Sequence, residues 1–316
     1  MMLKLKILSG RILILIGLIF SIVSCTGKNK PFDERPTRGD IKISVDESYK
    51  PLIDAEISTF TTFYSYAKIT PDYKPEWDVI SDFINDSVQL IVTNNKLTED
   101  QIGYLREQQI IVKTVIFAND ALAIIINKEN TDSLLTYNNI QDIFTSKITR
   151  WKDLNPESEL GEISVVFDNS KSGNVRYFKE KFEISGSLPD NFFAVNTNAE
   201  VIDHINRNIN GMGIISVNWI SDTDDSLSMS FINKIRVVAV SQPHLDESTY
   251  YRPYQGSIYQ KSYPFTREVY LISRETFIGL GSGFIAWVTG EKGQKIVLKS
   301  GLVPATMPVR FQQIAD

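Results

Sequence analysis

The chain has 316 residues, of which 42% are hydrophobic and 22% charged, with 33 lysine and arginine residues against 38 aspartate and glutamate residues. This composition is typical of a folded globular protein and excludes a disordered, collagen-like or disulfide-rich chain. With one cysteine, two histidines and a formal net charge of −5, we expect no metal, no cofactor and no nucleic-acid partner.

Residues 1–24 have the pattern of a signal peptide. Three basic residues and no acidic ones accompany an apolar run over residues 12–20 that continues to Val23. A spanning helix needs about 18 to 25 apolar residues, and this run has only about a dozen. The run ends in Ile22-Val23-Ser24-Cys25, which resembles the bacterial lipobox, and Cys25 is the single cysteine. We expect Cys25 to be lipidated; the alternative is a cleaved, unanchored secreted protein.

Residues 25–40 are polar and unpatterned, which is typical of a lipid-anchored tether. Removal of residues 1–24 leaves 292 residues, and the loss of three basic residues shifts the formal charge from −5 to −8. We therefore expect a protein of the periplasm or cell envelope. Its acyl group would hold it to a bacterial membrane without spanning that membrane.

Strand and helix patterns alternate after the tether. Alternation of this kind predicts a mostly parallel sheet covered by helices, with ligands at the carboxyl ends of the strands. In chain order the first predicted elements are a strand over residues 41–45, a helix over 49–63, a strand over 68–73, a helix over 77–84 and a strand over 88–93.

A second block repeats this alternation between β-rich stretches. The stretches cover residues 110–117, 121–127 and 267–273, and the C-terminal helices 277–288 and 292–300 follow them. About 290 residues are more than one hydrophobic core usually supports, so we expect two lobes. Lobe I would comprise residues 41–116 and 266–316, and lobe II residues 117–265. The block predicts helices at 139–144, 173–182 and 200–209 and strands at 163–167, 212–217 and 235–240.

Two segments resemble the periplasmic phosphate-binding proteins that serve ABC phosphate transporters. They are Phe117-Ala-Asn-Asp-Ala-Leu-Ala-Ile-Ile-Ile-Asn127 and residues 139–154, which contain Ile-Phe-Thr-Ser-Lys-Ile-Thr-Arg-Trp-Lys-Asp-Leu. Later landmarks follow in the family's order at 172–174, 211–216, 263–267, 290–296 and 301–304. The resemblance implies an α/β, two-lobed clamshell of the type II periplasmic-binding-protein fold. Each lobe would be a mostly parallel sheet flanked by helices, with two hinge crossings between the lobes.

The same resemblance implies a monomer that closes on an oxyanion, phosphate first, and delivers it to an ABC permease. An oxyanion held without a metal needs converging hydrogen-bond donors, which loops at helix N-termini supply. Three predicted strand-to-helix junctions offer such donors, although each also fits an ordinary helix cap or turn. The candidate ligand-binding residues are Ser48, Tyr49, Thr93, Asn94, Asp168, Ser170, Ser172, Gly173 and Asn174.

Several positions differ from the family's pattern. The arginine and the acid that precede the family's Ser-Gly-Thr fall on Asp168 and Ser170, and its proton-accepting carboxylate falls on Asn94. A Ser- and Gly-rich loop is replaced by residues 73–78, where we expect Glu76 to face the cleft. We hypothesise that Asp168 accepts the ligand's proton, with Arg176 or Lys171 supplying a cation. The alternative is that Asp168 caps a solvated turn.

Other function classes leave weaker signals. A sensor or protein-interaction lipoprotein with an altered pocket is the main alternative. A hydrolase built on Ser172 would need His204 or His244, and the chain has no Gly-x-Ser-x-Gly elbow, so we expect no enzyme. Trp77 beside Glu76 leaves sugar binding as a minor alternative.

Overall fold

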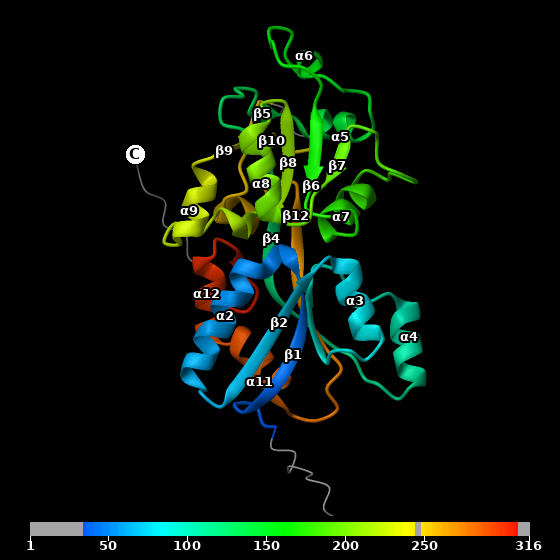
Figure 1. Cartoon of the computed structure of the whole chain (residues 1–316), viewed down its shortest axis with the longest axis vertical. Coiled ribbons are helices and arrows are strands. Elements are labelled where there is room, and N and C mark those ends of the chain that lie inside the picture. The colour runs from blue at the N-terminus through cyan, green and yellow to red at the C-terminus, as the bar shows by residue number, and fades with distance from the viewer. Residues whose placement is uncertain (1–33, 244–247, 309–316) are drawn as a thin grey trace, which may run out of the picture. The chain divides into compact units, whose positions relative to one another are not determined.

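The computed structural model describes residues 34–243 and 248–308 (Figure 1). The predicted signal peptide, Cys25, most of the tether and His244 lie outside the described residues. Within the described ranges, no helix is long and apolar enough to cross a membrane.

Parallel strands form both ends of the large sheet. In one half, β1 (Gly39–Asp46) pairs in parallel with β2 (Ala67–Lys74) and β3 (Leu90–Thr93). In the other, β6 (Ser164–Phe167) pairs in parallel with β7 (Phe192–Ala194) and β8 (Gly211–Ser216). The predicted mostly parallel lobes are therefore confirmed.

Two antiparallel strands connect these halves. β4 (Lys113–Asn127) pairs with β12 (Thr266–Ser273) along its first part and with β8 along its second part. β12 also pairs with β3, so the sheet runs without a break from β2 to β7 (Figure 1). The stretches predicted separately at 110–117 and 121–127 thus form one strand that passes from lobe to lobe. The lobe boundaries at 116/117 and 265/266 stay a prediction.

Helices flank the sheet on both sides (Figure 1). Beside the first half lie α2 (Lys50–Phe63), α3 (Glu76–Ile84), α4 (Glu99–Glu107), α11 (Leu280–Val288) and α12 (Glu291–Lys299). Beside the second lie α5 (Tyr137–Phe144), α6 (Trp151–Leu154), α7 (Gly173–Lys181), α8 (Asn198–Arg207), α9 (Ser226–Ile232) and α10 (Gln255–Tyr259). Short elements complete the chain: η1 (Glu47–Tyr49), β5 (Leu134–Leu135), η2 (Val217–Trp219), β9 (Ile235–Val237), β10 (Ala239–Ser241), β11 (Tyr250–Tyr251) and β13 (Val303–Pro304).

The sequence patterns missed several helices and short strands, among them α4, α6, α9, α10 and β7. Only Leu105 of α4 is buried, so this helix has almost no apolar face from which its periodicity could be read. The strand predicted over residues 235–240 is divided into β9 and β10, which pair with different partners, β4 and β5. That division arises from tertiary pairing that local patterns do not contain.

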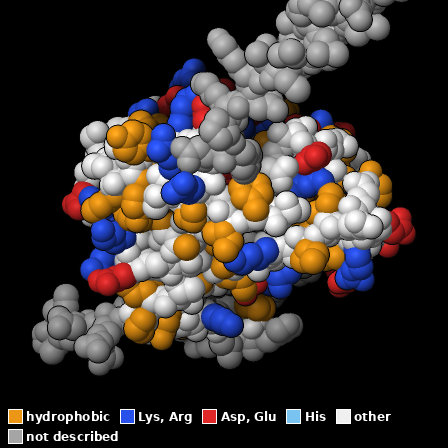
Figure 2. Space-filling view, turned by 90° about the horizontal axis from the view of Figure 1, so that it is seen from below, with side chains coloured by type: hydrophobic (Ala, Val, Ile, Leu, Met, Phe, Trp, Pro, Cys, Tyr) orange, Lys and Arg blue, Asp and Glu red, His pale blue; other side chains and the backbone are white. Residues whose placement is uncertain are grey.

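One continuous apolar core extends under both halves of the sheet. It includes Val45 of β1, Ile124 of β4 and Val166 of β6, all fully buried. A smaller cluster under α3 and α4 includes Phe83 and Leu105. On the face of the molecule seen in Figure 2, hydrophobic side chains are interspersed with charged ones.

Candidate functional site

The carboxyl ends of β1, β3 and β6 meet between the two halves. Ser48, just after β1, directs its hydroxyl to Asn174 Oδ1 at 3.4 Å. Asn94, just after β3, donates from Nδ2 to Asp46 Oδ2 at 2.8 Å. Residues from all three predicted junctions therefore lie in one buried polar cluster. In open parallel sheets, loops at the carboxyl ends of the strands meet in this way at the point where the strand order reverses. That these residues bind a ligand stays a prediction.

The turn after β1 is held by bonds to its own backbone. The Asp46 carboxylate accepts from the Ser48 N–H at 3.0 Å, and the Ser48 carbonyl accepts from Asn218 Nδ2 at 2.6 Å and Trp219 Nε1 at 3.1 Å. Tyr49 is fully buried, and its hydroxyl has no hydrogen-bond partner among the described residues. A buried phenol without a partner is costly, so this hydroxyl marks a place for a ligand or water.

Arg267, at the start of β12, lies at the centre of the cluster. Its Nε donates to Asp120 Oδ2 at 2.9 Å, and its Nη1 donates to Asn174 Oδ1 at 2.7 Å. Ser216 donates to the same Asp120 carboxylate at 3.0 Å. The guanidinium also lies 5.4 Å from the centre of the Tyr49 ring. Arg267 thereby joins four segments that are distant in the sequence.

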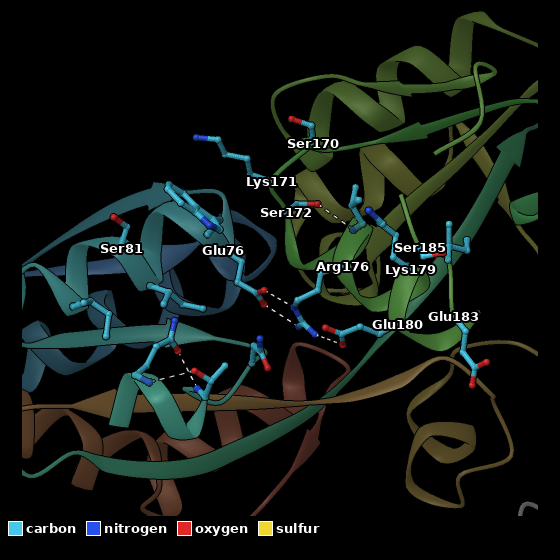
Figure 3. Close-up of a pocket in the computed structure, with 18 of the residues that line it drawn as sticks. Glu76, Ser81, Ser170, Lys171, Ser172, Arg176, Lys179, Glu180, Glu183 and Ser185 are labelled. Atoms are coloured by element: carbon cyan, nitrogen blue, oxygen red, sulfur yellow. Dashed lines mark hydrogen bonds and ion pairs between the residues drawn. The ribbon is translucent and has the colours of Figure 1, made fainter. Parts of the chain in front are cut away.

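Glu76 and Arg176 form a second pair across the cleft (Figure 3). Arg176 Nε donates to Glu76 Oε1 at 2.6 Å and Nη2 to Glu76 Oε2 at 3.0 Å, a two-pronged arrangement. Arg176 Nη2 also donates to Asn94 Oδ1 at 2.6 Å, and Thr93 Oγ1 lies 3.5 Å from Glu76 Oε2. Glu76 therefore faces the cleft, as expected, since its carboxylate pairs with an arginine of α7 in the other half.

An open pocket of about 1010 Å³ lies outside this pair, between α3 and α7 (Figure 3). Ser170, Lys171 and Ser172 line it together with Glu76 and Arg176. Ser170 is exposed, so among the predicted residues it belongs to the pocket's rim rather than to the buried cluster.

Asp168 has different neighbours from those hypothesised. It accepts from Asn174 Nδ2 at 3.0 Å and lies 3.5 Å from Asn198 Nδ2. Arg176 instead pairs with Glu76, while Lys171 pairs with Asp78 at 3.2 Å and lies over Trp77. Arg176 and Lys171 therefore have other acidic partners than Asp168, and the hypothesis that Asp168 accepts the ligand's proton while one of them supplies a cation stays a prediction. The alternative of a solvated cap is wrong, because Asp168 is 2% exposed.

Acidic groups outnumber cations in this cluster. The carboxyl groups are those of Asp46, Glu47, Glu76, Asp120 and Asp168, and the guanidinium groups are those of Arg176 and Arg267. Glu47 accepts from the Asn198 N–H at 3.1 Å and from Nδ2 at 2.6 Å. Both guanidinium groups are paired with acids, whereas Asp46, Glu47 and Asp168 are bound by amide, hydroxyl and backbone groups of the described residues.

Burial makes three of these carboxyl groups weak acids. It raises the pKa of Asp46 to about 7, with the charge of Glu76 adding to the effect and Arg267 opposing it. It raises the pKa of Glu47 to about 7 against the hydrogen bonds from Asn198, and that of Asp168 to about 7 against the hydrogen bond from Ser172. Burial therefore favours their protonated forms, which donate as well as accept hydrogen bonds.

The N-terminus of α7 approaches the cleft closely because Gly173 has no side chain. A Cβ there would lie 2.2 Å from Asn94 Nδ2 and 2.7 Å from Glu76 Oε2. Ser172 caps the helix by accepting from the Val175 N–H at 3.4 Å. Ser172, Gly173 and Asn174 are thus brought together with Asn94, as the predicted junctions require.

Sequence reasoning missed several members of the cluster. Arg267 lay within the landmark at 263–267 but was not singled out, and Asp46 and Glu47 stand directly before Ser48. For Asp46 and Glu47 the one available signal was that two acidic residues stand beside a loop predicted to bind an anion. Asn198 and Asn218 carry no local signal, because their partners, Glu47 and Ser48, are more than 100 residues away.

Comparisons with known proteins agree with this architecture. The phosphate-binding protein PstS of Staphylococcus aureus strain bovine RF122 / ET3-1 is 21% identical over 306 residues, which cover 95% of this chain and 89% of the relative. PstS of S. aureus strain USA300 is 22% identical over the same coverage.

Solved structures show the same fold. A candidate phosphate ABC transporter substrate-binding protein with bound phosphate from Clostridium perfringens has a TM-score of 0.72 at 24% identity, covering 84% of this chain and 100% of that one. An ABC-type phosphate transport receptor from Vibrio cholerae has a TM-score of 0.63 at 20% identity, covering 85% and 100%. Residues 31–292 match the family model of the PBP superfamily domain. The chain therefore belongs to the family described as the PBP superfamily domain, whose members are solute-binding proteins rather than enzymes.

Proposed function

We propose that the protein is an extracytoplasmic solute-binding lipoprotein that captures phosphate or a related oxyanion between its lobes and delivers it to an ABC permease. The observation that carries the proposal is the convergence of Ser48, Asn94 and Asn174 from three strand ends, beside Arg267. The names of the S. aureus relatives and of the C. perfringens and V. cholerae structures support the same ligand and the same partner.

The proposed ligand site keeps the predicted residues and adds Arg267. The start of α7 favours a bound anion, because the positive end of the helix dipole and the free backbone N–H donors both lie at the N-terminus of a helix. The Tyr49 hydroxyl supplies a buried donor without a partner among the described residues. The proposed contacts are Ser48, Tyr49, Thr93, Asn94, Asp168, Ser172, Gly173, Asn174 and Arg267, with Ser170 at the entrance.

Calorimetric titration and thermal unfolding test the proposal. The full chain in detergent is titrated with phosphate, arsenate and sulfate at pH 6 and pH 8. A ligand present at about 100 times its dissociation constant adds about 2.7 kcal/mol to the free energy of unfolding. We expect binding of phosphate and arsenate. An unchanged melting temperature with all three oxyanions contradicts the proposal.

A second candidate function is favoured by the excess of buried acids. Asp46, Glu47 and Asp168 form no ion pair in the described cluster, and an ionised carboxylate repels a dianion. A folded protein that ignores all three oxyanions would be a sensor or protein-interaction lipoprotein for another ligand. The titration above separates the two functions.

A further inference from the structure

A carboxylate of the protein itself, that of Glu76, lies against the N-terminus of α7 and pairs with an arginine of that helix. Glu76 belongs to α3 in the first half of the fold, while Arg176 and Gly173 belong to α7 in the second. The Glu76 carboxylate nevertheless receives both prongs of the Arg176 guanidinium, at 2.6 and 3.0 Å (Figure 3). This is the geometry with which arginine binds carboxylates and phosphates in general.

Further donors and a close backbone approach surround the same carboxylate. Thr93 Oγ1 lies 3.5 Å from Glu76 Oε2, and Arg176 is oriented by a bond to Asn94 Oδ1 at 2.6 Å. A Cβ on Gly173 would come within 2.7 Å of Glu76 Oε2, so the start of α7 abuts this oxygen. Glu76 therefore holds a set of groups that would suit an external oxyanion: an arginine, a hydroxyl and a helix N-terminus.

A second, independent feature of the cleft points to a ligand. The Tyr49 hydroxyl is buried and unpartnered among the described residues. The Arg267 guanidinium lies 5.4 Å from the centre of the Tyr49 ring. A donor is thus left free in the part of the cleft that contains Arg267.

The arrangement is stabilised on the outer side of the cleft. The Trp77 N–H donates to the Lys171 carbonyl at 3.3 Å, and Lys171 Nζ pairs with Asp78 at 3.2 Å. The first turn of α3 is thereby joined to the loop that precedes α7. The pocket of about 1010 Å³ lies outside, and Glu76 and Arg176 are among its lining residues.

We propose that Glu76 is the specificity-determining residue of the cleft, an internal anion that competes with external oxyanions for Arg176 and the N-terminus of α7. This inference rests on the proposed function. Glu76 holds the groups that an incoming anion would bind, and its charge also repels that anion. The free-energy cost of this repulsion grows with the charge of the ligand. Replacing Glu76 therefore increases the affinity for a dianion more than the affinity for a monoanion.

The test compares the full chain with its Glu76→Gln and Glu180→Gln variants in detergent, by calorimetric titration with phosphate and sulfate at pH 6 and pH 8. Glu180 contacts the same arginine at 2.7 Å from the solvent side, so its variant is a matched control. We expect Glu76→Gln to tighten phosphate binding by about tenfold or more at pH 8 and by less at pH 6, since affinity differences of that size accompany removal of a like charge. The Glu180→Gln variant stays within about twofold of the unsubstituted chain, as expected for an exposed pair.

The outcomes separate this inference from the proposed function. Phosphate binding by the unsubstituted chain together with equal or weaker binding by Glu76→Gln overturns the role of Glu76 and leaves the proposed function standing. Oxyanion binding by Glu76→Gln alone supports the role of Glu76 and overturns phosphate capture by the natural chain. Binding by neither protein overturns both. If the glutamine variant does not fold, Glu76→Asp, which withdraws the carboxylate by one methylene, is expected to show a smaller gain, and no gain overturns the inference.

Discussion

Arg267 and Asp120 act as one unit at the centre of the cleft. Both are buried, and removing one partner of such a pair generally costs about 3–5 kcal/mol because the other charge is left unpaired. Arg267 is thus committed to Asp120 and Asn174, and Arg176 is committed to Glu76 and Asn94. The cleft has two arginines, but neither is free of an acid.

The remaining buried carboxyl groups make stability depend on pH. Burial raises the pKa of Asp46 and Asp168 from 3.8, and of Glu47 from 4.5, to about 7. Glu56, buried against Trp287, has a pKa raised to about 8 and acts in the same direction. The folded state therefore binds more protons than the unfolded state between about pH 4 and pH 7, and the stabilisation is lost as the pH rises through the folded-state values.

We expect the free energy of unfolding to be lower at pH 8 than at pH 5 by several kcal/mol, since one unit of raised pKa corresponds to about 1.4 kcal/mol. Urea unfolding in oxyanion-free buffer measures the difference. The Asp168→Asn variant is the control, because it removes one titrating group and reduces the pH dependence. A free energy that is equal or higher at pH 8 contradicts the assignment of these groups as weak acids.

At the scale of elements, the two C-terminal helices meet with little space between their backbones. α11 ends at Val288, and α12 begins at Glu291. A Cβ on Gly293 would lie 2.5 Å from Val288 Cα and 2.6 Å from the Trp287 carbonyl oxygen, both backbone atoms that cannot rotate away. Glycine at this position is therefore required by packing, although glycine is a poor helix former.

We expect Gly293→Ala to destabilise the protein by about 1–3 kcal/mol, because overpacking outweighs the better helix propensity of alanine. Gly103 in α4 is the matched control, since nothing lies within 4 Å of its Cβ position. Gly103→Ala is expected to stabilise by about 0.5–1 kcal/mol. Urea midpoints of the two variants provide the comparison, and a shift of the same sign in both would refute the packing argument.

At the scale of the whole molecule, the two halves are joined both covalently and by contacts across the cleft. β4 and β12 continue the sheet from one half to the other. Across the cleft, Glu47 binds Asn198, and the Ser48 carbonyl accepts from Asn218 and Trp219. The protein's own side chains thus maintain a closed arrangement, which a ligand would enter by replacing some of these bonds.

The proposed lipid anchor depends on Cys25. If Cys25 carries the acyl group, we expect Cys25→Ser to move the protein from the membrane fraction to the soluble fraction, because the anchor is lost. Fractionation with immunodetection measures the change, and Ser21→Ala is the control because it leaves the cysteine in place. Retention of the serine variant in the membrane fraction argues against lipid anchoring.

Most of the fold could be predicted from local patterns, because each strand or helix depends mainly on residues that are close together in the chain. Apolar alternation at residues 41–45 and helical spacing at 77–84 correspond to β1 and α3, and the strand-end position of Ser48 and Asn174 follows from them. Parallel strands place their carboxyl ends at one edge, so convergence of these loops was predictable before any contact was known.

The electrostatic character of the site was decided by tertiary structure alone. The sequence indicated Glu76 and Asp168 as unusual and named Arg176 as a possible cation source, but it contained no signal that folding pairs Arg176 with Glu76, 100 residues away. Burial then determined which acids are paired and which are protonated, because desolvation depends on everything that packs around a group. The sequence by itself therefore determined the lobes and the loops. Only the folded chain decided that the cleft is rich in acids and that one of them, Glu76, pairs with Arg176 beside the start of α7.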